Sequence, residues 1–128
     1  EKEIMLLKEK LRQKEIKSEL IEDDKIYDSP DVVASFPGGS GAMNRWLSEN
    51  IKYPEMAKES GIQGKVFVQF IVSRNGSIGE VKVVRGVHKT LDREAIRAVK
   101  SMPNWSAGVN LGKTVRTSVH LPINFRLN

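Results

Sequence analysis

The clearest pattern along the chain is an alternation of apolar and polar residues from Val115 to Leu127. The odd positions are Val, Thr, Val, Leu, Ile, Phe and Leu, whereas the even positions are Arg, Ser, His, Pro, Asn and Arg. A period of two residues is typical of a strand with one face in the core and the other in water. The pattern therefore predicts a long, half-buried closing strand.

A second strand is predicted over residues 64–72, GKVFVQFIV, which is apolar on both faces. Such a strand belongs in the centre of a sheet or where both of its faces are covered. Asn75-Gly76 follows and predicts a hairpin with a type I′ turn, because both central residues of that turn need positive φ. The return strand, SIGEVKVVR, is shorter and more polar.

Helices are predicted on both sides of this hairpin. The stretch SGAMNRWLSENI has an apolar face, with Ser40 as its N-cap. A short helix follows between Pro54, which suits a first helical position, and Gly61, which suits a C-terminal stop. The stretch TLDREAIRAVKSMP is an amphipathic helix with Thr90 as N-cap and Pro103 at its end, and GVNLGK is then a loop.

The order helix, short helix, strand, strand, helix, strand predicts an α+β fold. A three-stranded sheet is built on the antiparallel hairpin, and helices pack on one of its faces. A helical crossover normally leaves the next strand parallel to the one before it. The closing strand then pairs antiparallel with the first strand of the hairpin, and it lies at an open edge of the sheet.

Pro122 indicates which flank of the closing strand is open. Proline cannot donate to a sheet ladder and is tolerated where its missing N–H would have faced solvent. Backbone groups of successive residues point to opposite flanks, so the odd residues should pair with the central strand. The even residues should then present free N–H and C=O groups. Protection against unwanted pairing and docking of another strand both explain such an edge.

Charge divides the 128-residue chain into two parts. Residues 1–28 hold 7 Lys or Arg and 9 Asp or Glu, a net charge of −2, and are rich in helix formers. They are predicted to be a charged helical linker or N-terminal extension. Residues 29–128 hold 14 basic and 7 acidic residues, a net charge of +7, and form the predicted domain. A basic domain favours acidic partners, with solubility as the alternative explanation.

The residues predict neither an enzyme nor a cofactor. The chain has no cysteine, so disulfides and thiolate metal sites are excluded. His88 and His120 are distant in sequence and have no nearby carboxylate cluster, so no metal site is expected. The serines lie outside a G-x-S-x-G context, and FPGGSG lacks the lysine of a phosphate-binding loop.

From about Phe36 to Leu127 the chain resembles the C-terminal domain family of TonB, the energy transducer of Gram-negative envelopes. The resemblance rests on Tyr53-Pro54 before a short helix, on GIQGKVFVQFIVSRNGSIGEVKVVR, on LDREAIRAVKSMPNW and on the closing PINFRL. FPGG and the helix after it are similar to the variant common in Bacteroidetes.

The resemblance implies a periplasmic domain anchored in the inner membrane by an N-terminal helix. Such domains bind the TonB box, a short extended segment of outer-membrane receptors that adds as a strand to the last strand. An ExbB–ExbD motor then uses proton-motive force to pull, and siderophores, haem, cobalamin or glycans enter. The implied contacts on the edge strand are Lys113, Arg116, Ser118, His120, Pro122, Asn124 and Arg126. Candidate contacts near the Tyr-Pro motif are Asn50, Tyr53 and Pro54.

Three other interpretations remain open. Related domains also end BlaR-like membrane metallopeptidase sensors, and the charged linker is compatible with that parent protein. A small basic sheet invites nucleic-acid binding, although such sheets display aromatic residues and this one offers only Phe67 or Phe70. An open edge also permits self-pairing into a homodimer.

Overall fold

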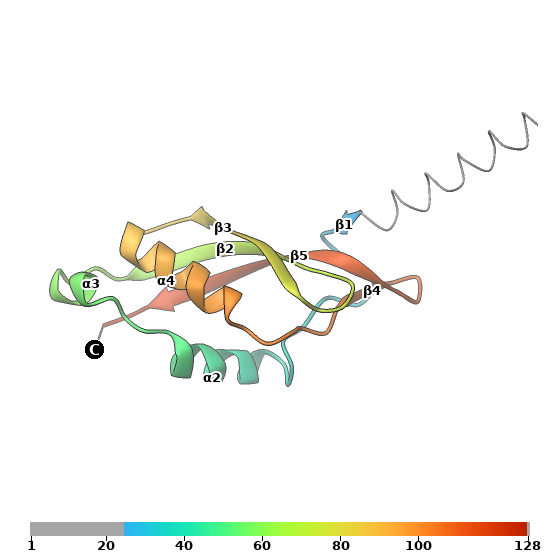
Figure 1. Cartoon of the computed structure of the whole chain (residues 1–128), viewed down its shortest axis with the longest axis horizontal. Coiled ribbons are helices and arrows are strands. Elements are labelled where there is room, and N and C mark those ends of the chain that lie inside the picture. The colour runs from blue at the N-terminus through green and yellow to red at the C-terminus, as the bar shows by residue number, and fades with distance from the viewer. Residues whose placement is uncertain (1–24, 128) are drawn as a thin grey trace, which may run out of the picture.

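A computed structural model describes residues 25–127 of the chain (Figure 1). Residues 1–24 of the predicted linker lie outside the described residues. The strands are β1 (Ile26–Tyr27), β2 (Gly64–Val72), β3 (Ile78–Arg85), β4 (Gly108–Asn110) and β5 (Lys113–Phe125). The helices are α2 (Ser40–Asn50), α3 (Glu55–Glu59) and α4 (Lys89–Lys100). Within residues 25–127, no helix has the length and apolar character needed to cross a membrane.

The α+β fold is confirmed, and the doubly apolar strand lies inside the sheet as predicted. The strand order is β1-β5-β2-β3, and β4 pairs with β5 beside this path. β2 runs antiparallel to both of its neighbours. The sheet therefore contains the three predicted strands in their predicted order, together with two short strands, β1 and β4, that the sequence did not predict.

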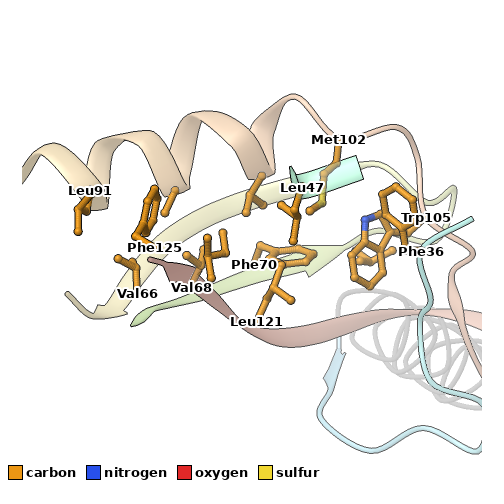
Figure 2. Close-up of a cluster of buried hydrophobic side chains, with 14 of the residues drawn as sticks. Phe36, Leu47, Val66, Val68, Phe70, Leu91, Met102, Trp105, Leu121 and Phe125 are labelled. Carbon is orange, nitrogen blue, oxygen red and sulfur yellow. The ribbon is translucent and has the colours of Figure 1, made fainter. Parts of the chain in front are cut away.

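The hydrophobic core lies on the face of the sheet that α4 covers (Figure 2). It joins side chains of β2, β5 and α4, because residues paired across two pleated strands project to the same side. The largest fully buried side chains are Phe70, Phe125, Leu91, Ile123, Val66, Val68, Val72 and Val99. Full burial of each stabilises the fold by about 1.5–3 kcal/mol. This core sets the register of β5, since a slip of one residue would turn its apolar set into water.

Trp105 closes one end of the core between two phenylalanine rings. Its ring meets Phe36 and Phe70 edge to face, at centroid distances of 5.9 and 5.2 Å. Its backbone N–H donates to the carbonyl of Gly76 at 2.8 Å. Trp105 therefore attaches the segment after α4 to the turn between β2 and β3.

The β2–β3 hairpin is confirmed, but the predicted type I′ turn is wrong. Gly76 has a φ of 89°, whereas Asn75 is not among the residues with positive φ. The carboxamide oxygen of Asn75 instead accepts a hydrogen bond from the Ser77 amide at 3.1 Å. Ser73 closes the loop by donating its N–H to the Ser77 carbonyl at 2.9 Å. Asn75 thus stabilises the turn through its side chain, and only Gly76 adopts the left-handed conformation.

A second hairpin occupies the loop predicted before the closing strand. Leu111 and Gly112 join β4 to β5 with φ values of 51° and 76°, as a type I′ turn requires. Asp31 supports this turn, because its carboxylate accepts from the Leu111 amide at 2.9 Å. A leucine carries no turn signature at this position, so the sequence pattern did not reveal the hairpin.

Both predicted N-caps are wrong by one or two residues. α2 begins at Ser40 itself, and Gly39 occupies the N-cap position without a side-chain hydrogen bond. The N-cap of α4 is His88, whose Nδ1 accepts from the Thr90 amide at 3.3 Å. His88 therefore has a local structural role at the start of α4.

Candidate functional site

The register of β5 shows that its even residues direct their backbone groups away from β2. Pro122 pairs with Phe67 inside a ladder without register shifts. Because proline has no N–H, Pro122 must belong to a pair that exchanges no hydrogen bonds, and the bonded pairs lie at Leu121 and Ile123. The backbone groups of the even residues therefore face the opposite flank of β5.

β1 covers part of that flank, which the sequence predicted to be open along its whole length. Ile26 pairs with Arg116 and Tyr27 with Thr117 in a parallel ladder. Beyond Thr117, no strand within residues 25–127 pairs with this flank. The part from His120 to Asn124 is called the open edge below. His120 and Asn124 each offer an N–H and a C=O there, whereas Pro122 offers only a C=O.

β4 pairs with β5 on the same flank as β2 does, so it leaves the open edge on the other flank accessible. Val109 of β4 exchanges two hydrogen bonds of 2.8 Å with Val32, which lies on the far side of β4 from β5. The hydrogen bonds between β4 and β5 must therefore come from Gly108 and Asn110. Their partners on β5 are Val115 and Lys113. Both partners are odd residues, and odd residues face β2.

A groove of about 340 Å³ lies between the open edge and α2. Leu47, Ile51 and Tyr53 contribute apolar surface, and Asn44 and Ser48 of α2 contribute polar side chains. Residues 122–126 of β5 and its end form the other wall. The groove places apolar surface beside backbone groups that lack a strand partner, which is the arrangement that an added strand requires.

Four of the predicted edge residues lie at this groove or on the open edge. Pro122, Asn124 and Arg126 line the groove. His120 lies on the open edge and is exposed. Within residues 25–127, Arg126 forms no ion pair, so its guanidinium is available to an acidic partner.

The other three predicted edge residues lie away from the groove. Ser118 is only 8% exposed, and its hydroxyl accepts a hydrogen bond from Gln69 Nε2 at 2.9 Å. Arg116 pairs with β1 and lies 3.7 Å from the Glu80 carboxylate. Lys113 follows the β4–β5 turn and lines a separate hollow. The structure therefore does not bring these residues together with the C-terminal half of the edge.

The residues of the Tyr-Pro motif divide in the same way. Tyr53 lines the groove, and its ring meets Phe125 edge to face at 5.7 Å. Its hydroxyl donates to the carbonyl of Ile62, which fixes the ring. Pro54 is the N-cap of α3, and Asn50 ends α2 without lining the groove. Tyr53 is thus both a core contact and part of the groove wall.

Glu94 of α4 holds the connection between α2 and α3 in place. Its carboxylate accepts from the Lys52 amide at 2.7 Å and from Arg97 Nε at 2.6 Å. Burial raises the pKa of Glu94, but the hydrogen bonds from Arg97 and Lys52 outweigh it, so this pKa lies below its ordinary value of 4.5. Because Ile51 adjoins Lys52, this ionised glutamate also positions the apolar wall of the groove.

The contribution of α2 to the groove was missed from the sequence. The apolar face of the helix contains Leu47, but it gives no information on which strand the helix lies beside. Asn44 and Ser48 are exposed polar residues in no recognisable motif. Only the packing of α2 beside β5 brings them to the open edge.

Residues 49–127 match the family described as "Gram-negative bacterial TonB protein C-terminal". The chain belongs to this family. The prediction that the domain is not an enzyme is thereby confirmed, since these domains are non-enzymatic. The match begins at the end of α2, so β1 and nearly all of α2 lie outside it.

Curated relatives and solved structures agree with this assignment. Protein TonB of Helicobacter pylori is 38% identical over 56 residues, covering 43% of this chain and 20% of the relative. Protein TonB of Xanthomonas campestris pv. campestris is 35% identical over 78 residues, covering 60% and 34%. The chain thus spans about a fifth to a third of these relatives. A solution structure of the Helicobacter pylori TonB C-terminal domain has 29% identity and a TM-score of 0.54, and the likeness covers 72% of this chain and 87% of that one.

Proposed function

We propose that this domain is the receptor-binding end of a TonB-type energy transducer. It binds a short extended segment, the TonB box, near the N-terminus of TonB-dependent outer-membrane receptors. The segment adds as a strand to the open edge of β5. The observation that carries the proposal is an edge with unpaired backbone groups beside a groove lined by both apolar and polar side chains, in a chain of the TonB C-terminal family.

The proposal places the domain in the periplasm, on a parent protein anchored in the inner membrane. An ExbB–ExbD-like motor drives that parent with proton-motive force, and the pull on the receptor admits a nutrient such as a siderophore. Support for this part comes from the family and from relatives named Protein TonB.

Strand addition alone predicts weak, reversible capture. Each backbone hydrogen bond contributes about 0.5–1.5 kcal/mol net, whereas association costs at least about 4 kcal/mol. Pro122 removes one donor from the edge, so few bonds are available. The groove and the free charge of Arg126 must therefore supply part of the affinity. Weak, reversible binding suits a carrier that must release its receptor after each pull.

An amide-resolved titration tests the proposal. Adding a synthetic peptide with the N-terminal segment of a TonB-dependent receptor should shift the amide signals of residues 120–126. Asn124→Pro removes one of the outward N–H donors and should weaken binding about fivefold. Asn124→Ala keeps the backbone donor and serves as the matched control. Shifts confined to other surfaces, or equal affinities for the two variants, would contradict strand addition at this edge.

The other interpretations receive less support. Phe70 is fully buried, and Phe67 is the one of the two predicted aromatic candidates that is exposed, at 38%. A nucleic-acid platform needs several exposed rings. No observation favours a metallopeptidase sensor as the parent. A second copy of the chain would compete for the same edge, and sedimentation at several concentrations measures that homodimer directly.

A further inference from the structure

Two segments outside the family match flank the open edge, and together they bound it on two sides. β1 occupies the flank at Arg116 and Thr117, and α2 forms the wall opposite residues 122–126. We propose that β1 and α2 convert the edge into a slot that selects its ligand. The slot accepts a short extended segment with an apolar side chain directed at Leu47 of α2 and at Ile51 and Tyr53, which follow the helix. This inference rests on the proposed strand addition and specifies which segments it admits.

The groove has room for whole side chains. A water molecule takes about 30 Å³ of liquid, which is roughly a tenth of the groove's volume of about 340 Å³. Its apolar surface comes from Leu47, Ile51 and Tyr53 on one wall and from Pro122, Ile123 and Phe125 on the other, and Asn44 and Ser48 border it on α2. Burying an apolar side chain in this position lowers the free energy of binding. Burying a polar side chain there costs free energy, because the side chain loses its hydrogen bonds to water.

The geometry of an added strand decides which of its side chains enter the groove. Successive side chains of a strand point to opposite faces of the sheet. One alternate set must therefore face α2, on the side of the buried Ile123 and Phe125. The other set lies beside the exposed His120 and Asn124. The matching segment alternates apolar and polar residues, and a carboxylate at the end near Arg126 complements the free guanidinium.

The two ends of the slot limit its length. At one end β1 pairs with Thr117, so a strand in line with β1 meets an occupied flank. At the other end β5 stops at Phe125. A segment that spans the open edge therefore fills the slot, and residues beyond it add no further ladder bonds.

Two blocked peptides test the slot. Both are about seven residues long and alternate Thr with a variable residue, and both carry one Asp near one end. The variable residue is Leu in one peptide and Ala in the other. The domain should bind the Leu peptide about tenfold more tightly, since one inserted Leu side chain gains that much from burial.

Bulky substitutions on α2 test whether this helix forms the wall of the slot that selects the ligand side chain. Ser48→Trp fills the groove and should abolish the preference for Leu over Ala. Glu49→Trp is the matched control, because Glu49 is exposed on the same helix but does not line the groove. It should keep the preference. Asn44→Trp provides a second blocking variant from the same helix face if Ser48→Trp does not fold.

The outcomes separate this inference from the proposed function. If the Leu and Ala peptides bind equally and both shift the amides of residues 120–126, strand addition stands and the slot is wrong. If Ser48→Trp and Asn44→Trp both retain the tenfold preference, α2 is not the selecting wall. If neither these peptides nor a receptor segment shifts the open-edge amides, the proposed function itself fails.

Discussion

At the scale of single residues, Gly76 connects local turn chemistry to the tertiary structure. Its φ of 89° lies in the left-handed region that glycine adopts readily. A Cβ at this position would lie 2.0 Å from the carbonyl oxygen of Trp105. The same residue accepts a hydrogen bond from the Trp105 amide. The glycine is therefore required both by the turn and by the segment packed against it.

Gly76→Ala should lower the free energy of unfolding by at least ~2 kcal/mol, because a left-handed alanine is strained and its Cβ displaces Trp105. Gly79→Ala is the control. Gly79 has no positive φ, and an added Cβ there meets nothing within 4 Å. Urea denaturation of both variants measures the difference. Equal midpoints would show that the Gly76–Trp105 contact does not contribute to stability.

At the scale of elements, the open edge depends on how two small segments are held. β1 has two residues and is held to β5 by its ladder at Arg116 and Thr117. The connection between α2 and α3 is held by the contacts of Glu94 with Lys52 and Arg97. The connection also packs Ile51 and Tyr53 against the core, whereas Ile26 of β1 is 40% exposed. A single substitution should therefore release β1, and the loss of Glu94 should weaken the connection without releasing it.

Tyr27→Pro should release β1, because proline removes the N–H that Tyr27 directs at β5. The amide of Ser118 lies on the flank that β1 covers, and its hydrogen exchange should accelerate at least about tenfold. The amide of Leu121, which pairs with β2, provides the internal control and should keep its protection. Unchanged exchange at Ser118 would mean that β1 does not protect this flank.

Glu94 should make stability depend on pH. Its pKa is lowered in the folded state, so its contribution is complete above the ordinary pKa of 4.5 and is lost as the pH falls through the lower folded-state pKa. Glu94→Gln should cost about 1 kcal/mol at pH 7 and much less at pH 3. Glu59→Gln, on an exposed glutamate of α3, is the control. Urea midpoints at both pH values measure the change, and a loss of equal size at pH 3 would contradict it.

At the scale of the whole molecule, charge and shape act on different steps of binding. Residues 29–128 carry a net charge of +7, which attracts acidic segments over a distance that salt shortens. The groove and the open edge then act at contact. The family match covers β2 to β5, α3 and α4, whereas β1 and most of α2 lie outside it. Selectivity in this chain is thus expected from segments that lie outside the family match.

Arg126→Gln should weaken binding of the Asp-containing Leu peptide about two- to fivefold at low salt, which is the range for an exposed ion pair. The same peptide with Asn in place of Asp should bind both proteins equally. Raising the salt concentration should remove the difference, which calorimetric titrations at low and high salt would detect. A persistent difference at high salt would assign Arg126 a role other than charge.

The sequence by itself determined the three main strands, the three helices α2, α3 and α4, and which flank of β5 receives the backbone groups of Pro122. These depend on local properties: a period of two residues, two-sided apolarity, and the missing N–H of proline. Only the tertiary structure decided that β1 covers Arg116 and that α2 borders the open edge. Both features join residues far apart in the chain, as the Ile26–Arg116 pair does. No sequence pattern predicts which strand lies beside a two-residue strand, or beside a helix whose groove residues are the exposed Asn44 and Ser48.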